Sequence, residues 1–366
     1  MKVLFSVNIP SPYRTEFFNE LGKLCDLTVC YERRSASDRD AKWVGKEAQH
    51  YHEVYLDLKP VGVDKSHGSA LRKYIAANSA DHLILTNYIS PACMEAILYC
   101  KLKRIPYWVE YDGGFNRKDP LLKRVLKKIL IGGARGHLTT CDDHIDYLKG
   151  LGIPAERIFK YPFTSLTEKD LEAASRITEE EKRQQKQGLG IAEEKMILSV
   201  GQLIPRKGFD VLLRAAGNLP RDIGVYIVGG SPGEDLQKLK ESLELDNVHF
   251  VEFKTKQELH QYYMASDLFV LPTREDIWGL VINEAMSFGL PIITTKKCIA
   301  GTELVKDGEN GYLVEADDVQ QTTERIRTLI ESEQKRIQMG NMSRNRIRRY
   351  TIEKMARRHI EVLQSH

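Results

Sequence analysis

The residues from Arg274 to Pro291, REDIWGLVINEAMSFGLP, follow a short apolar run, LFVLP, and open a helical pattern. The first turn of a helix carries backbone N–H groups without intrahelical acceptors and a partial positive charge, so it attracts anions. The amides of Gly279, Leu280 and Val281 therefore form a candidate site for a diphosphate. The glycine lets the anion approach the backbone closely.

Two acids accompany this helix start. Asp276 precedes the helix, where it can reach a sugar ring, and Glu284 lies a little over one turn inside it, where its carboxylate can accept two hydroxyl hydrogen bonds from a ribose. The alternative is that Asp276 only caps the helix and Glu284 is a solvated acid. Capping is worth only about 1 kcal/mol and does not require these neighbours, so we favour ligand binding.

A basic pair lies in a second strand–loop–helix pattern, SVGQLIPRKGFDVLL, from Ser199 to Leu213. Gly201 permits a tight turn, Lys207 is a compact cation suited to a phosphate, and Arg206 adds a planar guanidinium. Together they could neutralise a diphosphate leaving group. A basic pair before a helix is also common on solvated surfaces, so this motif alone leaves both interpretations open.

Short β-branched runs alternate with helical patterns in both halves of the chain. This rhythm predicts an α/β protein with two parallel sheets, each covered by helices on both faces. Ligands of such doubly wound, Rossmann-like domains bind outside the carboxyl ends of the strands, so we expect a site in a cleft between two facing domains. The predicted strands are 3–7, 27–32, 53–56, 82–86 and 107–110 in the first half and 196–200, 225–228, 248–253, 268–271 and 292–294 in the second; the predicted helices of the first half include 14–24, 69–80 and 91–103.

The polar, charge-rich segment 167–194, which includes TEEEKRQQKQ, separates the two halves. It suits a helix followed by a linker. We therefore expect a first domain over 1–170, a linker over 171–195 and a second domain over 196–350. The final basic helix, 351–366, either caps the second domain or crosses back to complete the first, and we expect the crossing.

Composition excludes several classes of protein. The 366 residues are 42% hydrophobic and 29% charged, the balance of a soluble globular protein, and the net charge of +3 is too small for a nucleic-acid binder. The six cysteines form no CxxC pair, which predicts reduced thiols and argues against a zinc site. No apolar run approaches the roughly 20 residues that span a bilayer, and MKVLFSVNI fits a first strand better than a signal peptide, so we expect a cytoplasmic protein.

The second half resembles the retaining glycosyltransferases of family 4, the group 1 glycosyltransferases, whose GT-B fold pairs two Rossmann-like domains. It is most similar to members that build bacterial polysaccharides. The order, spacing and glycine positions agree across VGQLIPRKGFDVLLRAA, YIVGG, HFVEF, ELHQYYMASDLFVLPTREDIWGLVINEAMSFGLPIITT and GTELVKDGENGYLV. The resemblance implies that the first domain binds an acceptor and the second a nucleotide diphosphate sugar, with UDP as the usual nucleotide.

In that family, two glutamates separated by seven residues bind the donor, the first at the sugar hydroxyls and the second at the ribose. The second falls on Glu284 here, whereas the first position holds the shorter Asp276, with Glu275 beside it as an alternative. The family's phosphate-binding loop carries an arginine and then a lysine. This chain has Gln202 in the first place and keeps Lys207, with neighbouring 206 as a substitute cation.

The first half departs further from the family. Members often place a histidine after the strand that corresponds to 107–110, whereas this chain reads WVEYDGGF, with Asp112, or as second choice Glu110, in that neighbourhood. Asp112 either belongs to the site or shapes a turn with its glycines. Asn8 and Arg14 lie in the loop after the first strand and are candidates for acceptor or phosphate contacts, although an arginine at a helix start is often simply exposed.

The chemistry that the resemblance implies is transfer of a hexosyl- or N-acetylhexosaminyl-type group, with retention at the anomeric carbon, to a saccharide or lipid-linked saccharide. The departing phosphate helps to deprotonate the acceptor, so the protein's main tasks are positioning and leaving-group stabilisation, assigned to Asp276, Lys207 and Asp112. Neither a metal ion nor a cofactor is expected. A nucleotide-sugar epimerase or sugar phosphorylase of the same fold and a non-catalytic sugar-nucleotide-binding scaffold are the alternatives.

The segment 118–131, KDPLLKRVLKKILI, has the pattern of a basic amphipathic helix. It either docks on anionic lipid, where each basic residue near the surface contributes about 1 kcal/mol, or packs as an ordinary helix with a solvated basic face. In the first case the protein would be peripheral on the inner face of the cell membrane. The acceptor would then be lipid-linked, as in capsule or O-antigen assembly.

Overall fold

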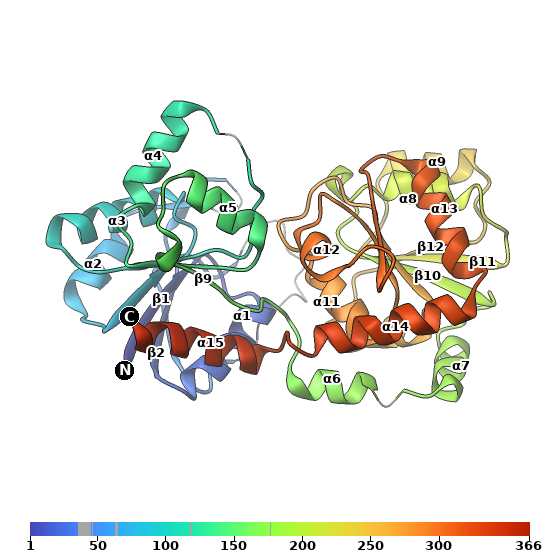
Figure 1. Ribbon diagram of the computed structural model, residues 1–366, viewed down its shortest axis with the longest axis horizontal. Coiled ribbons are helices and arrows are strands. Elements are labelled where there is room, and N and C mark those ends of the chain that lie inside the picture. Colours follow the sequence, from blue (N-terminus) through green and yellow to red (C-terminus); the bar gives the residue numbers. More distant parts are fainter. Residues whose placement is uncertain (36–44, 46, 63–64, 118, 176) are drawn as a thin grey trace. The chain divides into compact units, whose positions relative to one another are not determined.

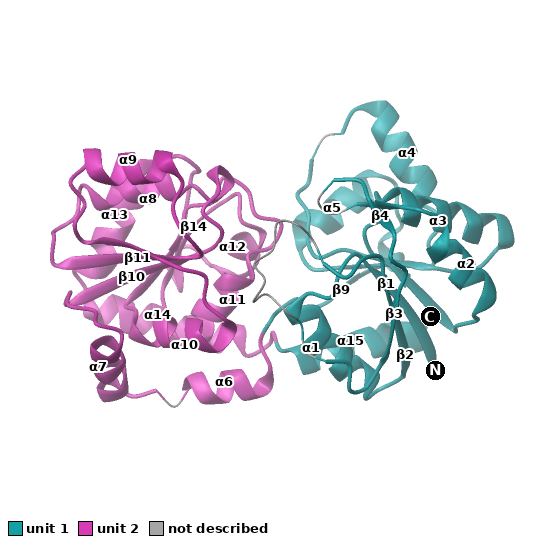
Figure 2. Ribbon diagram, turned by 180° about the vertical axis from the view of Figure 1, so that it is seen from behind, with its two compact units in different colours: residues 1–165, 351–366 teal, residues 166–350 magenta. Residues whose placement is uncertain are grey.

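The computed structural model describes residues 1–366 except 36–44, 46, 63–64, 118 and 176. The chain forms two compact units (Figure 2). Unit 1 comprises Met1–Ser165 together with Thr351–His366, and unit 2 comprises Leu166–Tyr350. The chain therefore passes between the units twice, and unit 1 is built from two separate stretches of sequence.

Unit 1 contains a seven-stranded sheet in the order β3-β2-β1-β6-β7-β8-β9, with every neighbouring pair parallel (Figure 1). All the residues of β6 and all but the first of β1 are buried, as expected of strands covered by helices on both faces. The strands are β1 (Lys2–Val7), β2 (Asp26–Tyr31), β3 (His52–Tyr55), β6 (His82–Leu85), β7 (Trp108–Glu110), β8 (Gly136–Thr139) and β9 (Ile158–Lys160), with β4 (Lys59–Pro60) and β5 (Ser66–His67) as a separate antiparallel pair. The helices are α1 (Pro12–Gly22), α2 (Ala70–Ala77), α3 (Pro91–Lys103), α4 (Leu121–Ile131), α5 (Asp142–Gly150) and α15 (Ile352–Ser365).

Unit 2 contains a six-stranded parallel sheet in the order β12-β11-β10-β13-β14-β15, which is the strand order of the Rossmann fold. The order reverses between β10 and β13, so the loops after these two strands flank the switch point at which such sheets bind ligands. The strands are β10 (Lys195–Val200), β11 (Ile223–Val228), β12 (Val248–Val251), β13 (Leu268–Leu271), β14 (Ile292–Thr295) and β15 (Gly311–Val314). The helices are α6 (Glu168–Ser175), α7 (Glu179–Gly188), α8 (Phe209–Ala216), α9 (Glu234–Ser242), α10 (Lys256–Ala265), α11 (Leu280–Ser287), α12 (Ile299–Leu304), α13 (Val319–Ile330) and α14 (Glu333–Ile347).

The α/β class and the parallel sheets predicted from the sequence are confirmed, and every predicted strand is present with its ends shifted by at most two residues. The first helix begins at Pro12 instead of Arg14, because proline suits the first helical position, where its missing N–H has no intrahelical acceptor to lose. The sequence analysis does not predict β4, β5, β8, β9 and β15.

The segment expected to be a linker, 171–195, consists largely of helices α6 and α7 and belongs to unit 2. Although α7 is polar on every side, Lys182 and Lys186 reach the Asp267 carboxylate at 2.6 and 2.8 Å, and the same carboxylate accepts the N–H of Met196. These contacts hold α7 at the amino end of β10 and β13. The boundary between the units accordingly lies at 165/166, before the segment in which the sequence placed it.

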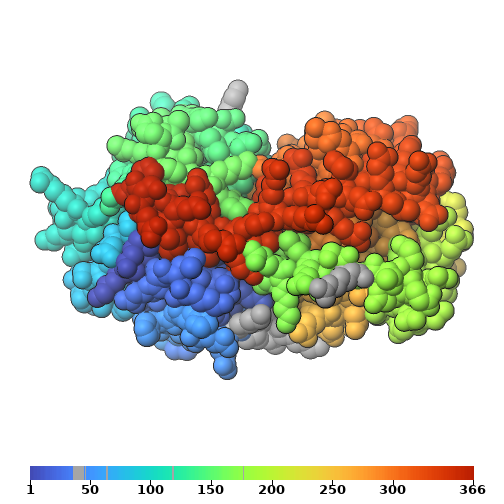
Figure 3. Space-filling model, turned by 60° about the horizontal axis from the view of Figure 1, so that its bottom comes forward, coloured from blue at the N-terminus to red at the C-terminus, as the bar shows by residue number. Residues whose placement is uncertain are grey.

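The C-terminal helix α15 lies in unit 1, beside α1 (Figure 3). The rings of Phe17 and His359 are 4.9 Å apart, and Arg358 donates a hydrogen bond of 3.2 Å to the carbonyl of Lys160. The last residues of the chain thus complete the core of the unit that the first residues begin.

Candidate functional site

The loops after β10 and β13 are joined by hydrogen bonds at the switch point of unit 2. The carbonyl oxygen of Arg206 accepts the N–H of Arg274 at 2.8 Å and the hydroxyl of Thr273 at 3.0 Å. Because the carboxyl ends of parallel strands lie at one edge of the sheet, the basic loop and the acidic loop predicted from the sequence meet there.

Lys207 and Asp276 form a nearly buried ion pair where the two loops meet. The Lys207 Nζ lies 2.5 Å from the Asp276 Oδ2, and the side chains are 11% and 12% exposed. Arg206 lies 3.8 Å from the other Asp276 oxygen and donates a hydrogen bond to the carbonyl of Glu275. Of the two neighbouring acids, Asp276 is therefore the one whose carboxylate contacts the lysine.

Two glycines allow the loop after β10, the loop after β13 and the start of α11 to lie close together. Gly208 has φ +68°, and a Cβ there would lie 2.2 Å from the carbonyl oxygen of Pro272. Gly279 has φ +98° at the N-cap of α11, and a Cβ there would lie 2.9 Å from the Cys298 Sγ and 3.6 Å from the Asp276 Oδ2. The Asp276 carboxylate thus lies beside the start of α11, where the N–H groups of the first helical residues, 280 and 281, have no intrahelical acceptor.

Glu284 is half-buried on α11, little more than a turn beyond this helix start. The hydroxyl of Tyr263, which is fully buried on α10, donates a 3.0 Å hydrogen bond to its Oε2. Burial and the adjacent carboxylate raise the pKa of Tyr263 well above its usual value, so the hydroxyl remains a donor. Tyr263 therefore orients Glu284, a role that the sequence does not reveal because the two residues lie on different helices.

Arg274 is a second residue that sequence reasoning left without a role. Its guanidinium binds both oxygens of Asp210 at 2.9 and 2.7 Å, donates to the carbonyl of Pro205 and contacts Asp317 at 2.7 Å. It thereby fastens the acidic loop to the start of α8. In the sequence, the only indication of this role is that Arg274 directly precedes the acidic pair Glu275 and Asp276.

Gly201 directly follows β10. Its N–H donates to the carbonyl of Val228 at 2.9 Å, and its own carbonyl lies so close to Gly229 that a Cβ there would be 2.0 Å away. The Lys207 side chain runs past Gly201, with its Cε 3.4 Å from the position of a Cβ. A Cβ at Gly201 would only contact the lysine, so the positive φ of +155° is the feature that favours glycine here.

In unit 1, Arg14 is buried between two acids at the carboxyl end of the sheet. It forms ion pairs with Glu110, at 2.5 Å, and with Asp112, and is only 4% exposed. The alternative that Arg14 is an exposed helix-start residue is therefore wrong. Both Asp112 oxygens are directed at α1, one to Arg14 and the other to the Tyr13 hydroxyl at 3.2 Å.

The two acids around Arg14 have different environments. Glu110 also accepts hydrogen bonds from Tyr161 at 3.1 Å and from His359 at 3.3 Å. Burial alone would raise the pKa of Glu110, but Arg14 and His359 outweigh burial and lower it to about 2. The pKa of Asp112 is raised by burial and by the negative charge of Glu110. Of the two acids, Asp112 is thus the one that takes up a proton first.

Asn8 follows β1 and is half-exposed. Its side-chain oxygen accepts the N–H of the next residue, Ile9, at 2.8 Å, and its carbonyl accepts the N–H of Arg33 at 2.9 Å. These bonds give Asn8 a part in shaping the loop. Its predicted contact with an acceptor stays a prediction.

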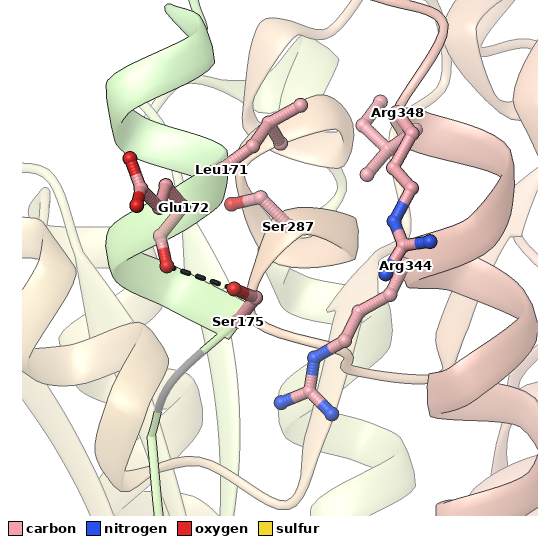
Figure 4. Close-up of a pocket in the computed structure, with 7 residues that line it drawn as sticks. Leu171, Glu172, Ser175, Ser287, Arg344 and Arg348 are labelled. Carbon is pink, nitrogen blue, oxygen red and sulfur yellow. Dashed lines mark hydrogen bonds between the residues drawn. The ribbon is translucent and has the colours of Figure 1, made fainter.

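A cavity of about 160 Å³ lies in unit 2 between α6, α11 and α14 (Figure 4). Figure 4 shows the guanidinium groups of Arg344 and Arg348 beside it, and the Ser175 hydroxyl donates to the carbonyl of Glu172 at 2.8 Å. Arg344 also donates to the carbonyl of Phe288, at the C-terminal end of α11. The cavity is lined by Leu171, Glu172, Ser175, Ser287, Arg344, Ile347 and Arg348, none of which the sequence placed at the donor site.

Residues 181–346 match the family described as "Glycosyl transferases group 1". An uncharacterized glycosyltransferase of Haemophilus influenzae is 35% identical over 175 residues, and a D-inositol 3-phosphate glycosyltransferase of Corynebacterium urealyticum is 28% identical over 265 residues. These alignments cover 46% and 68% of this chain, and the chain spans 49% and 61% of the length of those two relatives.

Solved structures resemble the whole chain. Anabaena HepE in complex with UDP has a TM-score of 0.79 at 18% identity, with 100% of both chains covered. WaaG, a glycosyltransferase involved in lipopolysaccharide biosynthesis, has a TM-score of 0.72 at 16% identity, again with 100% of both chains covered. At these identities the likeness concerns the fold. The group 1 glycosyltransferase match concerns residues 181–346, and the likeness over the whole chain is to the fold of these solved structures.

Proposed function

We propose that this protein transfers a glycosyl group from a nucleotide diphosphate sugar, with UDP as the nucleotide, to a saccharide or lipid-linked saccharide in cell-surface polysaccharide synthesis. The observation that carries the proposal is the meeting of Lys207, Asp276 and the start of α11 at the switch point, with Glu284 a turn further along the helix. HepE, which shares the fold, was solved with UDP and with UDP-glucose.

Each part of the donor has a group suited to it. Lys207, Arg206 and the N–H groups of Leu280 and Val281 would hold the diphosphate, because they supply positive charge and donors on one side of the site. Glu284, oriented by Tyr263, would accept the ribose hydroxyls. The carboxylate of residue 276, with 275 as the alternative, would accept the hydroxyls of the sugar.

The transfer proceeds with retention at the anomeric carbon. The bond from that carbon to the acceptor oxygen forms on the face from which the bond to the phosphate oxygen breaks, and the acceptor proton passes to the departing phosphate. Lys207 and the helix start stabilise the charge that develops on this leaving group, and holding both reactants in place lowers the barrier further. We propose that these groups suffice without a metal ion or cofactor, and that Asp112 takes part in the transfer. We place this activity in the cytoplasm.

The assignment predicts the effect of removing two of these side chains. We expect Glu284→Ala and Lys207→Ala each to lower turnover at least tenfold, roughly 1.4 kcal/mol of transition-state stabilisation. The measurement is nucleotide release from a panel of nucleotide sugars with saccharide and lipid-linked acceptors. Lys297→Ala, which changes an exposed lysine in the neighbouring loop, is the matched control and should retain wild-type turnover.

The same assay separates the alternative functions. An epimerase would convert the nucleotide sugar without an acceptor, a phosphorylase would require inorganic phosphate, and a scaffold would bind the nucleotide sugar without releasing nucleotide. Near-native turnover in both alanine variants would refute the donor site described above.

A further inference from the structure

Helix α4 exposes its apolar face to solvent. The side chains of Leu121 and Leu122 are 78% and 82% exposed, and those of Val125, Leu126 and Ile129 are about half exposed. The spacing of these residues, i, i+1, i+4, i+5 and i+8, places them along one side of the helix. The apolar face consists of Leu121, Leu122, Val125, Leu126 and Ile129. A helix that packs in the ordinary way would bury this side and expose its charges.

The opposite side of α4 is anchored to unit 1, which explains this orientation. Lys127 Nζ lies 2.7 Å from the Asp119 Oδ2 and 2.6 Å from the Tyr147 hydroxyl. Arg124 donates to the carbonyl of Gly150 at 2.6 Å. The helix lies beside α3 and α5 at the edge of the unit (Figure 1). The exposed apolar face does not fit an ordinary packed helix, although Lys123, Arg124 and Lys128 are exposed as well.

Basic residues border the apolar face. Lys123 and Lys128 are exposed on α4, at opposite edges of its apolar side. The neighbouring helix α3 ends in KLK and is followed by Arg104, and its Lys101 donates to the carbonyl of Ile129. α3 also exposes Leu98 and Leu102, at 52% and 79%. Apolar and positively charged side chains are thus presented together by two adjacent helices.

We propose that α4 is the surface by which unit 1 docks on an anionic lipid bilayer. The apolar face would enter the boundary between headgroups and acyl chains, while Lys123 and Lys128 contact the anionic headgroups. Eleven residues extend only about 16 Å, so the helix would lie in the plane of the interface. Among the described residues, no helix combines the length and hydrophobicity needed to cross a membrane.

A lipid surface fits this face better than a second copy of the chain. In a symmetric dimer through α4, the lysines that border one apolar face would lie beside those that border the other, and like charges across an interface oppose association. An anionic bilayer satisfies both the apolar and the charged residues. The docking surface bears on the proposed lipid-linked acceptor, but it can be tested without any transfer reaction.

The experiment is flotation of the full chain with vesicles of phosphatidylcholine, alone or mixed with phosphatidylglycerol. We expect wild type to float with the mixed vesicles and less so in high salt. Leu122→Ser with Val125→Ser and Leu126→Ser should weaken binding at least tenfold on the mixed vesicles. The double variant Lys123→Gln and Lys128→Gln should bind the mixed vesicles roughly thirtyfold more weakly than wild type, about fivefold for each charge. It should show no preference for the mixed vesicles over neutral ones.

Ile337→Ser is the matched control, because Ile337 is 56% exposed on α14 of unit 2 and should float like wild type. All variants should keep the wild-type circular dichroism spectrum and nucleotide release with a soluble acceptor, since α4 carries no donor-site residue. The proposal is overturned if wild type stays with the unbound fraction or if the serine variant floats unchanged. A wild-type dimer that the serine variant dissociates, without vesicle binding by either, would overturn it in favour of a second copy.

Discussion

At the scale of single residues, the contact between Lys207 and Asp276 decides how the donor site responds to charge. Lys207 contacts the Asp276 carboxylate, which itself lies beside the start of α11. An anion that binds Lys207 must share it with that carboxylate. Asp276 therefore weakens the site for phosphate while it supplies an acceptor for sugar hydroxyls.

This balance predicts opposite effects on two ligands. We expect Asp276→Asn to bind UDP several-fold more tightly than wild type, because Lys207 loses its negative partner, and to transfer sugar at least tenfold more slowly. Calorimetric titration with UDP and the nucleotide-release assay measure the two effects. Asp276→Glu, which keeps the charge, is the control and should leave UDP affinity near wild type. A weaker affinity of the asparagine variant for UDP would contradict this account.

Glu32 is a residue whose ionisation should govern the stability of unit 1. It directly follows β2, is 1% exposed and accepts a hydrogen bond from Ser90 at 3.2 Å. Burial raises its pKa from 4.5 to about 7, and the serine hydroxyls lower it only in part. The stability that protonated Glu32 contributes is therefore complete below pH 4.5 and is lost as the pH rises through about 7.

We accordingly expect Glu32→Gln to stabilise the protein at pH 8 relative to wild type and to have little effect at pH 4. A shift of the Glu32 pKa from 4.5 to about 7 corresponds to an effect of Glu32→Gln on the free energy of unfolding that differs by on the order of 3 kcal/mol between pH 8 and pH 4. Urea unfolding at both pH values measures it. Glu53→Gln, at an exposed position, is the control and should show no such pH dependence. Equal stabilities of Glu32→Gln and wild type at pH 8 would rule out the burial argument.

At the scale of elements, the donor site depends on a few connections between loops. Arg206 and Thr273 link the loop after β10 to the loop after β13, and Arg274 ties both to α8. Gly208 lies where these loops are closest, against the carbonyl of Pro272. The loops keep this arrangement because no side chain separates them at that point.

We therefore expect Gly208→Ala to destabilise unit 2 by about 1–3 kcal/mol, since its φ of +68° and the clash with Pro272 both oppose a Cβ. Gly217→Ala at the end of α8 is the matched control. Gly217 has φ −59°, and its Cβ would meet nothing nearer than 3.5 Å, so the change should be neutral or slightly stabilising. Thermal unfolding of both variants provides the comparison, and equal midpoints would refute the close-approach argument.

At the scale of the whole molecule, the chain builds unit 1 from both of its ends. α15 covers α1, and its His359 reaches Glu110, which is 249 residues earlier in the sequence. Glu110 in turn holds Arg14, so the C-terminal helix supports the acid–arginine cluster at the carboxyl end of the sheet. Unit 2 is continuous in sequence and contains no residue of this helix.

Removal of residues 351–366 should consequently destabilise unit 1 while leaving unit 2 folded. We expect hydrogen exchange to quicken in β1, β7 and α1, whose buried faces lose their cover, and to stay slow in β10 and β13. Hydrogen exchange followed by mass spectrometry reads the two units separately in one sample. Uniform loss of protection in both units, or none in either, would contradict this division.

Much of the donor site was predictable because its parts are local in sequence. Gly279, Leu280, Val281 and Glu284 belong to one loop and one helix, so the helical period alone relates them. That Lys207 meets Asp276 followed from the expectation that both loops follow strands of one parallel sheet. Whether these side chains bind a donor remains a prediction of the site.

The residues that the sequence did not assign are those whose partners are distant along the chain. Tyr263 acts on Glu284 from another helix, Arg274 finds Asp210 in the first turn of α8, and His359 completes unit 1 from its C-terminal end. No periodicity or spacing signals such pairs. They depend on strand order and on which helix covers which face.

The sequence by itself determined the parallel α/β class, most of the strands and the helix start at Gly279, because these depend on periodicity and backbone preferences within a few residues. Only the tertiary structure decided that Tyr263 orients Glu284 and that α4 turns its apolar side outward. Both outcomes depend on contacts between segments far apart in sequence. For α4 the deciding contacts are those of Lys127 and Arg124 with the body of unit 1.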